Sequence, residues 1–226
     1  MGKLTNNKEG AVNLPKVYFF DLDRTLVKGN ITFKLLIHYF LSHPYLTLAR
    51  LSSHLNIGLQ YLTHPKDLKS AHALISILMG HHVPELLWHS KGWQQKVIEK
   101  AVYLPVYQEM MRALHLGHRV MILSAAPDFI VQLVLHTLGD LEGMGTEYNL
   151  MAPDQLKIVK IMNGREKAST VMRIKDELGI DKDQLVAYSD SINDLALLAA
   201  VGEPVVVNGD KKILKIAQEE NWRTIP

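Results

Sequence analysis

Short apolar segments that each end in a cluster of polar residues recur along the chain, and this pattern constrains the fold more than any other feature. The segments are rich in β-branched and aromatic residues, which is typical of buried parallel strands. They are residues 16–20, 119–123, 184–188 and 204–207. Segments with helical periodicity alternate with them, at residues 128–138, 167–178, 194–200 and 211–220. The alternation predicts an α/β fold with a doubly wound parallel sheet, which is a Rossmann-like core.

Residues 29–103 break this alternation. They show helical patterns separated by His43-Pro44, His64-Pro65 and residues 80–84, so we expect an inserted helical cap domain. The predicted organisation is an N-terminal tail at residues 1–13, a core domain at 14–28 plus 104–226, and the cap domain at 29–103. The most apolar stretch of the insertion, residues 35–49, is interrupted and shorter than the roughly 18 apolar residues of a membrane-spanning helix.

The composition argues against several classes of function. The 226-residue chain has no cysteine, which excludes structural disulfides, thiolate zinc sites and a cysteine nucleophile. It has no basic stripe with interleaved aromatic residues, so nucleic acid is not an expected partner. The first ten residues are polar and lack the apolar stretch of a secretory signal, so we expect a cytoplasmic protein. The sequence gives no indication of the oligomeric state.

The predicted cap domain carries a surplus of positive charge. Residues 28–104 hold eight Lys or Arg against three Asp or Glu, although the whole chain has a net charge of only +2. Such a surplus can attract an anionic substrate or lie on an anionic membrane surface, and a solvated basic helical face explains it too. The histidines of this region, including His81, His82 and His89, show no spacing typical of metal ligands, so we expect them at the surface.

The strongest chemical signal is the segment VYFFDLDRTLV at residues 17–27, in which Asp21, Asp23 and Thr25 follow the first predicted strand. In an extended segment, residues two positions apart project to the same side, so the two carboxylates can face one ligand. One carboxylate can then act as a nucleophile while the other transfers protons. Further polar clusters end the other predicted strands, and ligands of open α/β sheets bind at the carboxyl ends of strands.

Together, these clusters resemble the four motifs of the haloacid dehalogenase-like superfamily, in the same order along the chain. The matches are Asp21-Leu22-Asp23-Arg24-Thr25, then Ser124, then Lys167 in Gly164-Arg165-Glu166-Lys167, then Ser189-Asp190-Ser191-Ile192-Asn193-Asp194. The position of the helical insertion, directly after the first motif, resembles the arrangement in the branch that includes phosphoserine phosphatases. The resemblance does not cover residues 29–103. Arg24 departs from the Gly, Ser or Met-like residue expected between the second Asp and Thr, and we expect it to face solvent or the insertion.

The resemblance implies a phosphatase that uses Mg²⁺ and forms an aspartyl phosphate on Asp21. Phosphoryl transfer needs an in-line nucleophile and neutralised phosphoryl oxygens, and Mg²⁺ prefers oxygen ligands. The implied catalytic residues are Asp21 as nucleophile, Asp23 as general acid and base, and Lys167 as the cation that keeps Asp21 ionised. The implied phosphate-binding residues are Thr25, Ser124, Ala125 through its backbone N–H, and Asn193. The implied metal ligands are Asp21, the carbonyl of Asp23, and Asp190, with Asp194 in support.

Some of these roles have alternatives in the sequence. Lys160 and Lys175 lie close enough to Lys167 along the chain to compete for its role. Ser124 and Asp194 are also suitable helix N-caps.

The expected substrate is a small-molecule phosphate monoester, and the sequence does not identify its leaving group. Residues 28–66 contain no Asp or Glu, although a phosphoserine phosphatase is expected to carry a carboxylate early in its cap for the substrate ammonium group. The apolar and basic character of residues 31–62 favours an amphiphile such as a lysophosphatidate-like ester, unless these side chains pack the core of the cap itself. The alternative function is a non-catalytic binding or regulatory module that retains the fold.

Overall fold

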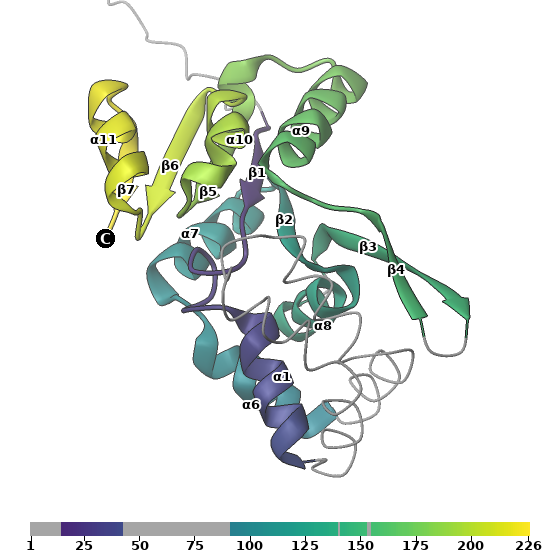
Figure 1. Ribbon diagram of the computed structural model, residues 1–226. Coiled ribbons are helices and arrows are strands. Elements are labelled where there is room, and N and C mark those ends of the chain that lie inside the picture. Colours follow the sequence, from purple (N-terminus) through teal and green to yellow (C-terminus); the bar gives the residue numbers. More distant parts are fainter. Residues whose placement is uncertain (1–14, 43–90, 140, 153–154) are drawn as a thin grey trace, which may run out of the picture.

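A seven-stranded sheet forms the centre of the protein in the computed structural model, which describes residues 15–42, 91–139, 141–152 and 155–226 (Figure 1). The strands are β1 (Val17–Phe20), β2 (Arg119–Pro127), β3 (Glu142–Ala152), β4 (Gln155–Lys160), β5 (Leu185–Ser189), β6 (Glu203–Val207) and β7 (Arg223–Ile225). Their order is β4-β3-β2-β1-β5-β6-β7, and every neighbouring pair is parallel except β3 and β4. The central strand β1 therefore has β2 on one side and β5 on the other.

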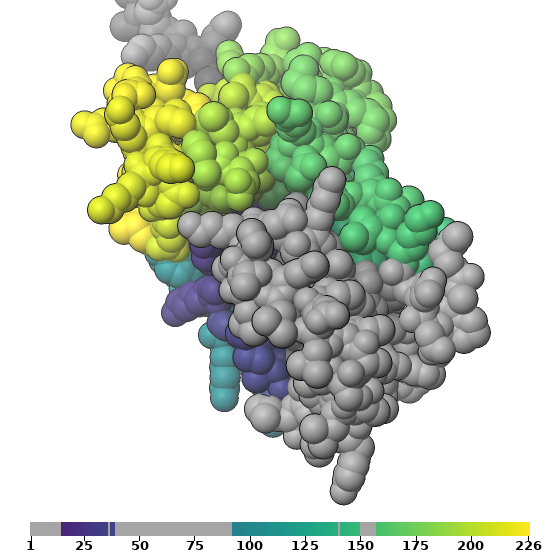
Figure 2. All heavy atoms as spheres, in the orientation of Figure 1, coloured from purple at the N-terminus to yellow at the C-terminus, as the bar shows by residue number. Residues whose placement is uncertain are grey.

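Helices cover both faces of this sheet. They are α1 (Ile31–Ser42), α6 (Lys91–Ala101), α7 (Leu104–His115), α8 (Asp128–Leu138), α9 (Gly164–Leu178), α10 (Leu195–Ala199) and α11 (Lys211–Glu219), with short 3₁₀ helices η1 (Lys182–Gln184) and η2 (Ile192–Asp194). Phe19 is fully buried in a core with α9, α10 and α11, whereas Phe20 is fully buried in a second core with α1, α6, α7 and α8. Successive strand residues point to opposite faces, which explains the two cores. In Figure 2, α9 and α11 form part of the outer surface.

The predicted α/β fold with a mainly parallel sheet is confirmed. Three predicted strands are observed within one residue of their expected ends, and the helix predicted at 128–138 has the observed limits of α8. The predicted end of the second strand is wrong, because β2 continues to Pro127 instead of stopping at residue 123. Its pairing with β3 shifts between Leu123 and Pro127, so the polar residues continue the strand through an irregularity. Ser124 therefore lies within β2.

The sequence pattern did not predict α7, β3, β4 or β7. β3 contains two glycines and several polar residues, and it pairs with β4 as an antiparallel ribbon at one end of the sheet (Figure 1). β7 is only three residues long and is exposed at two of them. Such edge elements lack the buried apolar runs that identify central strands.

The predicted cap domain is represented in the described residues by α1 and α6. These two helices contact each other, and the rings of His38 and Trp93 stack with their centroids 4.3 Å apart. Leu35 of α1 and Ile98 of α6 are fully buried in the same core as Phe20. Residues 43–90, including His81, His82 and His89, lie outside the described residues, as does the tail at 1–14, so the cap domain stays a prediction. Within the described ranges, no helix is long and apolar enough to cross a membrane.

Candidate active site

The carboxyl ends of β1 and β5 bring the first and fourth motifs together. Asp21 follows β1 directly, and its backbone N–H donates to the carbonyl of Tyr188 in β5 at 2.9 Å. Asp190 follows β5 in the same way. Both carboxylates are buried, at 6% and 5% exposure. The parallel pairing of the two strands thus places two acidic side chains side by side at one edge of the sheet.

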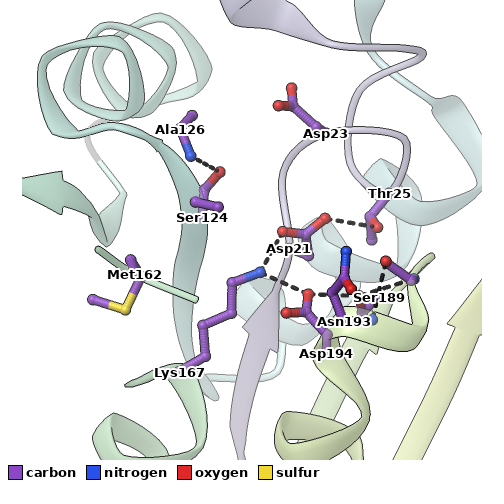
Figure 3. A network of polar contacts seen from close by, with 12 residues as sticks. Asp21, Asp23, Thr25, Ser124, Ala126, Met162, Lys167, Ser189, Asn193 and Asp194 are labelled. Atoms are coloured by element: carbon purple, nitrogen blue, oxygen red, sulfur yellow. Dashed lines mark hydrogen bonds and ion pairs between the residues drawn. The ribbon is translucent and has the colours of Figure 1, made fainter. Parts of the chain in front are cut away.

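Lys167 links Asp21 to the fourth motif (Figure 3). Its Nζ donates to Asp21 Oδ1 at 2.6 Å and to Asp194 Oδ2 at 2.7 Å, and its side chain is almost completely buried. The two lysines that competed for this role lie elsewhere. Lys160 pairs with Glu166 at the surface, and Lys175 contacts the exposed Asp176. The structure therefore selects Lys167 as the lysine that contacts the predicted nucleophile.

The start of α9 fixes the position of Lys167. Asn163 caps this helix, because its side chain accepts hydrogen bonds from the backbone N–H groups of Arg165 and Glu166. Gly164 follows, and a Cβ atom there would lie 2.0 Å from the carbonyl oxygen of Asn193. The absence of a side chain allows α9 to approach the fourth motif closely, which brings Lys167 to Asp21 and Asp194.

The buried charges of this network stabilise one another. Burial opposes the charged form of Lys167, but the carboxylates of Asp21 and Asp194 outweigh it and raise the pKa of the lysine. Burial raises the pKa of Asp21, and the Lys167 ammonium opposes that rise. Thr25 is fully buried and donates from Oγ1 to Asp21 Oδ2 at 3.2 Å. Both oxygens of Asp21 are thus held by donors.

Asp23 is held by a different set of donors. Its Oδ1 accepts from the backbone N–H of Ile31 at 2.7 Å, and its Oδ2 accepts from the Asn30 side chain at 2.9 Å. Asp23 therefore contacts the first residue of α1. Burial raises the pKa of Asp23 to about 7, the Ile31 hydrogen bond opposes this rise, and the charge of Asp21 adds to it. A carboxyl group with such a pKa can gain and lose a proton near neutral pH.

The predicted phosphate-binding residues are spread over three elements. Ser124 is buried in β2, and its Oγ accepts from the Ala126 N–H at 3.1 Å. The neighbouring Ala125 accepts from Thr146 Oγ1 at 2.8 Å through its carbonyl. Asn193 is exposed in η2. Figure 3 shows Ser124 across from Asp21 and Asn193 beside Asp194, so the four motifs surround Asp21.

Asp190 and Asp194 differ in their partners. The Asp194 Oδ2 accepts from Lys167 and, at 2.7 Å, from Ser189 Oγ, so this carboxylate orients the lysine. Asp190 Oδ2 instead contacts Arg24 Nε at 2.8 Å. Burial raises the pKa of Asp190 to about 7, the charges of Asp21 and Asp194 add to this, and Arg24 opposes it.

Several contributors were missed by the sequence patterns. Ser189 was read only as part of the fourth motif, although it holds Asp194. Asn163 and Gly164 position α9, although the sequence pattern named Gly164 only as a member of the third motif. Asn163 with Glu166 three residues later is a helix-start signal that could have identified the cap. Arg24 is largely exposed, as predicted, with 64% of its side chain accessible, but its contact with Asp190 was not anticipated.

A hollow of about 1090 Å³ lies in another part of the molecule, near the starts of β1, β5 and β6. Tyr18, Glu109, Glu203 and Trp222 are among the residues that line it. None of the predicted site residues does. The site chemistry is therefore concentrated at the opposite ends of these strands.

The fold and site together define an α/β protein of the kind that binds ligands beyond the carboxyl ends of its strands. Comparison with known proteins gives the family: the model of the haloacid dehalogenase-like hydrolases matches residues 18–199. The chain belongs to this family, which the motifs had predicted.

Relatives and solved structures extend this likeness over nearly the whole chain. A phosphoserine phosphatase of Mycobacterium tuberculosis is 24% identical over 226 residues, which cover 96% of this chain and 72% of that protein. A histidinol-phosphatase of Neisseria meningitidis is 30% identical over 112 residues, which cover 47% of this chain and 50% of that protein.

Two solved structures share the fold at low sequence identity. A protein of unknown function from Bordetella pertussis has a TM-score of 0.75 at 18% identity and covers 94% of this chain and 98% of its own. A substrate-bound phosphoserine phosphatase has a TM-score of 0.63 at 16% identity and covers 93% of this chain and 92% of its own. The family match and the phosphoserine phosphatase relative confirm the predicted resemblance to the phosphoserine phosphatase-like branch, and the two structures share its fold.

Proposed function

We propose that this protein is a phosphatase that hydrolyses a phosphate monoester through an aspartyl phosphate on Asp21, with Mg²⁺ as its cofactor. The observation that carries the proposal is the buried contact of Lys167 with both Asp21 and Asp194, beside Thr25 and Ser124. Burying three such charges costs desolvation free energy, and buried charge clusters of this kind are typical of functional sites. The family match and the names of the relatives support the same reaction class.

The residues at the site fit a magnesium ion. Asp21, Asp190 and Asp194 are buried carboxylates, and the cationic side chains that contact them are Lys167 and Arg24. The described side chains leave a surplus of negative charge, which one further cation would neutralise. In the described part of the chain no three His, Cys, Asp or Glu side chains form a metal site on their own. Mg²⁺ does not require one, since it binds through one or two carboxylates and keeps several waters.

We assign the metal ligands to Asp21, Asp190 and the backbone carbonyl of Asp23. When bound there, Mg²⁺ would neutralise charge on the phosphoryl oxygens. Asp194 would act through its hydrogen bonds to Lys167 and Ser189, which hold the lysine against Asp21.

In the first step, a carboxylate oxygen of Asp21 attacks phosphorus, and the bond between phosphorus and the leaving alcohol oxygen breaks. Asp23 donates its proton to that oxygen, so the product leaves as a neutral alcohol. A pKa of about 7 allows Asp23 to hold this proton near neutral pH. Lys167 keeps Asp21 ionised, and Thr25, Ser124, Asn193 and the Ala125 N–H bind phosphoryl oxygens.

In the second step, a water attacks the phosphorus of the aspartyl phosphate. Asp23, now ionised, takes the proton of that water, and the bond between phosphorus and Asp21 breaks to release inorganic phosphate. Asp21 and Asp23 return to their starting protonation states. One general acid and base thus serves both steps.

The substrate class is a small or amphiphilic organic phosphate. The names of the relatives point to phosphate esters of amino alcohols, namely phosphoserine and histidinol phosphate. Residues 28–66 contain no Asp or Glu, which argues against recognition of a substrate ammonium group by the first part of the cap. The basic and apolar character of this segment favours an amphiphilic substrate. We infer that the predicted cap at residues 29–103 binds the leaving group and so determines substrate specificity.

The test is the release of inorganic phosphate from a panel of monoesters, with Mg²⁺ and with EDTA. The panel contains phosphoserine, histidinol phosphate, sugar phosphates, nucleotides, phosphoethanolamine and lysophosphatidate. The proposal predicts turnover that requires Mg²⁺ and is abolished in Asp21→Asn. The matched control is Asp176→Asn, because this carboxylate on α9 is 72% exposed and lies outside the site. A folded wild-type protein without turnover on any ester would favour the non-catalytic binding module instead.

A further inference from the structure

Arg24 places a cationic side chain on a carboxylate that we assign to the metal. Its Nε lies 2.8 Å from Asp190 Oδ2, and the two side chains differ sharply in exposure, at 64% for Arg24 and 7% for Asp190. The carboxylate is thus fixed inside the site, whereas most of the arginine faces water. A contact of this kind can break without burying a bare guanidinium, because the arginine stays solvated when it moves away.

The backbone conformation at Arg24 directs its side chain toward Asp190. Arg24 has φ +61°, in the left-handed region that non-glycine residues rarely adopt. Its N–H donates to the carbonyl of Gly29 at 3.1 Å, and its carbonyl accepts from the Asn208 side chain at 3.4 Å. The backbone is therefore held on both sides, and the arginine projects from a fixed point beside Asp190. The conformation is retained despite its cost, although a glycine would adopt it freely.

The charges around Asp190 favour a cation there. Asp21 and Asp194 are close enough for their negative charges to act on Asp190, and both are contacted by Lys167. Lys167 donates to Asp21 and Asp194, and Arg24 contacts Asp190. Two cations are thus distributed over three carboxylates, and Arg24 is at Asp190, which we assign to the metal together with Asp21.

We propose that the guanidinium of Arg24 occupies the cation position at Asp190 in the metal-free protein and leaves it when Mg²⁺ binds. This inference rests on the function proposed above. Mg²⁺ needs direct access to a carboxylate oxygen, and a guanidinium that forms an ion pair with the same carboxylate competes for it. Arg24 therefore lowers the affinity for the metal and shields Asp190 in its absence.

The expected effect is modest because Arg24 is exposed. Partly exposed ion pairs shift an equilibrium by up to about fivefold. We expect Arg24→Met to bind Mg²⁺ about two- to fivefold more tightly than the wild type. Met has an unbranched side chain and leaves the strain of the positive φ at residue 24 unchanged. Gly would remove this strain together with the charge, so the two effects could not be separated. Mg²⁺ should also raise the melting temperature more in Arg24→Met than in the wild type.

The test is titration calorimetry of the full chain with Mg²⁺ alone, without substrate, together with thermal melts at matched metal concentrations. Arg165→Met controls for the loss of a positive charge near the site, because Arg165 is exposed in the first turn of α9 two residues before Lys167. Tighter binding in Arg24→Met and little change in Arg165→Met would support displacement. Equal affinities of the wild type and Arg24→Met, or an equal gain in Arg165→Met, would overturn it.

The two proposals fail in different ways. A wild type that binds Mg²⁺ while Arg24→Met binds it equally well contradicts the displacement only and leaves the proposed function intact. A wild type that binds no Mg²⁺ and releases no phosphate contradicts the proposed function, and the displacement with it.

Discussion

Replacing Lys167 by Met tests the buried charge network directly. Lys167 is 1% exposed and pairs with Asp21 and Asp194, which are both 6% exposed. Met fills nearly the same space without a charge, so the substitution leaves two buried carboxylates facing each other. Removing one partner of a buried ion pair costs about 3 to 5 kcal/mol. We expect Lys167→Met to lower the free energy of unfolding by about that amount at pH 8 in the absence of metal.

Urea unfolding in EDTA, followed by circular dichroism, measures this cost. With a denaturant slope of about 2 to 3 kcal/mol per M, the midpoint should fall by about 1 to 2.5 M. Lys160→Met is the matched control, because the Lys160 pair with Glu166 is partly exposed at both side chains. Exposed pairs contribute about 0 to 1 kcal/mol, so this control should barely move the midpoint.

The cost of Lys167→Met should depend on pH. Without the ammonium, burial and the charge of Asp194 raise the folded-state pKa of Asp21 further above the usual value of 3.8. A raised carboxyl pKa means that the folded state binds more protons than the unfolded state, so stability falls as pH rises above about 4. The defect should therefore be largest at pH 8 and shrink toward pH 5. A defect no larger than that of Lys160→Met, or one independent of pH, would refute the role given to this network.

Two further substitutions test the proton donor and the close approach of α9. Asp23→Asn should slow hydrolysis of alkyl phosphates by about 10²- to 10⁴-fold, but it should leave a rapid burst of p-nitrophenol from p-nitrophenyl phosphate, whose leaving group needs no proton. Stopped-flow absorbance measures that burst, and its loss would contradict the assignment. Gly164→Ala should lower the free energy of unfolding, measured in urea, by about 1 to 3 kcal/mol, because the new Cβ would lie 2.0 Å from the Asn193 carbonyl oxygen. Gly92→Ala, with nothing within 4 Å, should be neutral or stabilising by up to about 1 kcal/mol, and similar costs for the two would refute the packing argument.

The central strands could be predicted from the sequence because burial on both faces imposes a continuous apolar run. Phe19 and Phe20 are both fully buried, one on each face of β1. At the edges this signal disappears. Arg223 and Thr224 of β7 are exposed, and β3 carries Gly143 and Gly145 where a Cβ would approach the backbone of β2 or Asp128. Those glycines meet a tertiary constraint, and no local propensity indicates it.

The order of the motifs along the chain predicted which residues would meet, because parallel strands bring their carboxyl ends to one edge. Asp21 and Asp190 are neighbours for this reason, although 168 residues separate them. The choice of Lys167 over Lys160 came from the resemblance alone, and its physical basis is the start of α9 at Gly164.

Side-chain partners depend on geometry that the spacing of motifs does not contain. Arg24 shows this, since its identity marked a departure from the family pattern but did not reveal the contact with Asp190. That contact requires a left-handed backbone at residue 24, the Gly29 and Asn208 hydrogen bonds that hold it, and the position of β5 beside β1. A departure from a motif beside a predicted catalytic residue therefore indicates which position to examine, and the charge that its side chain contacts in the fold indicates its role.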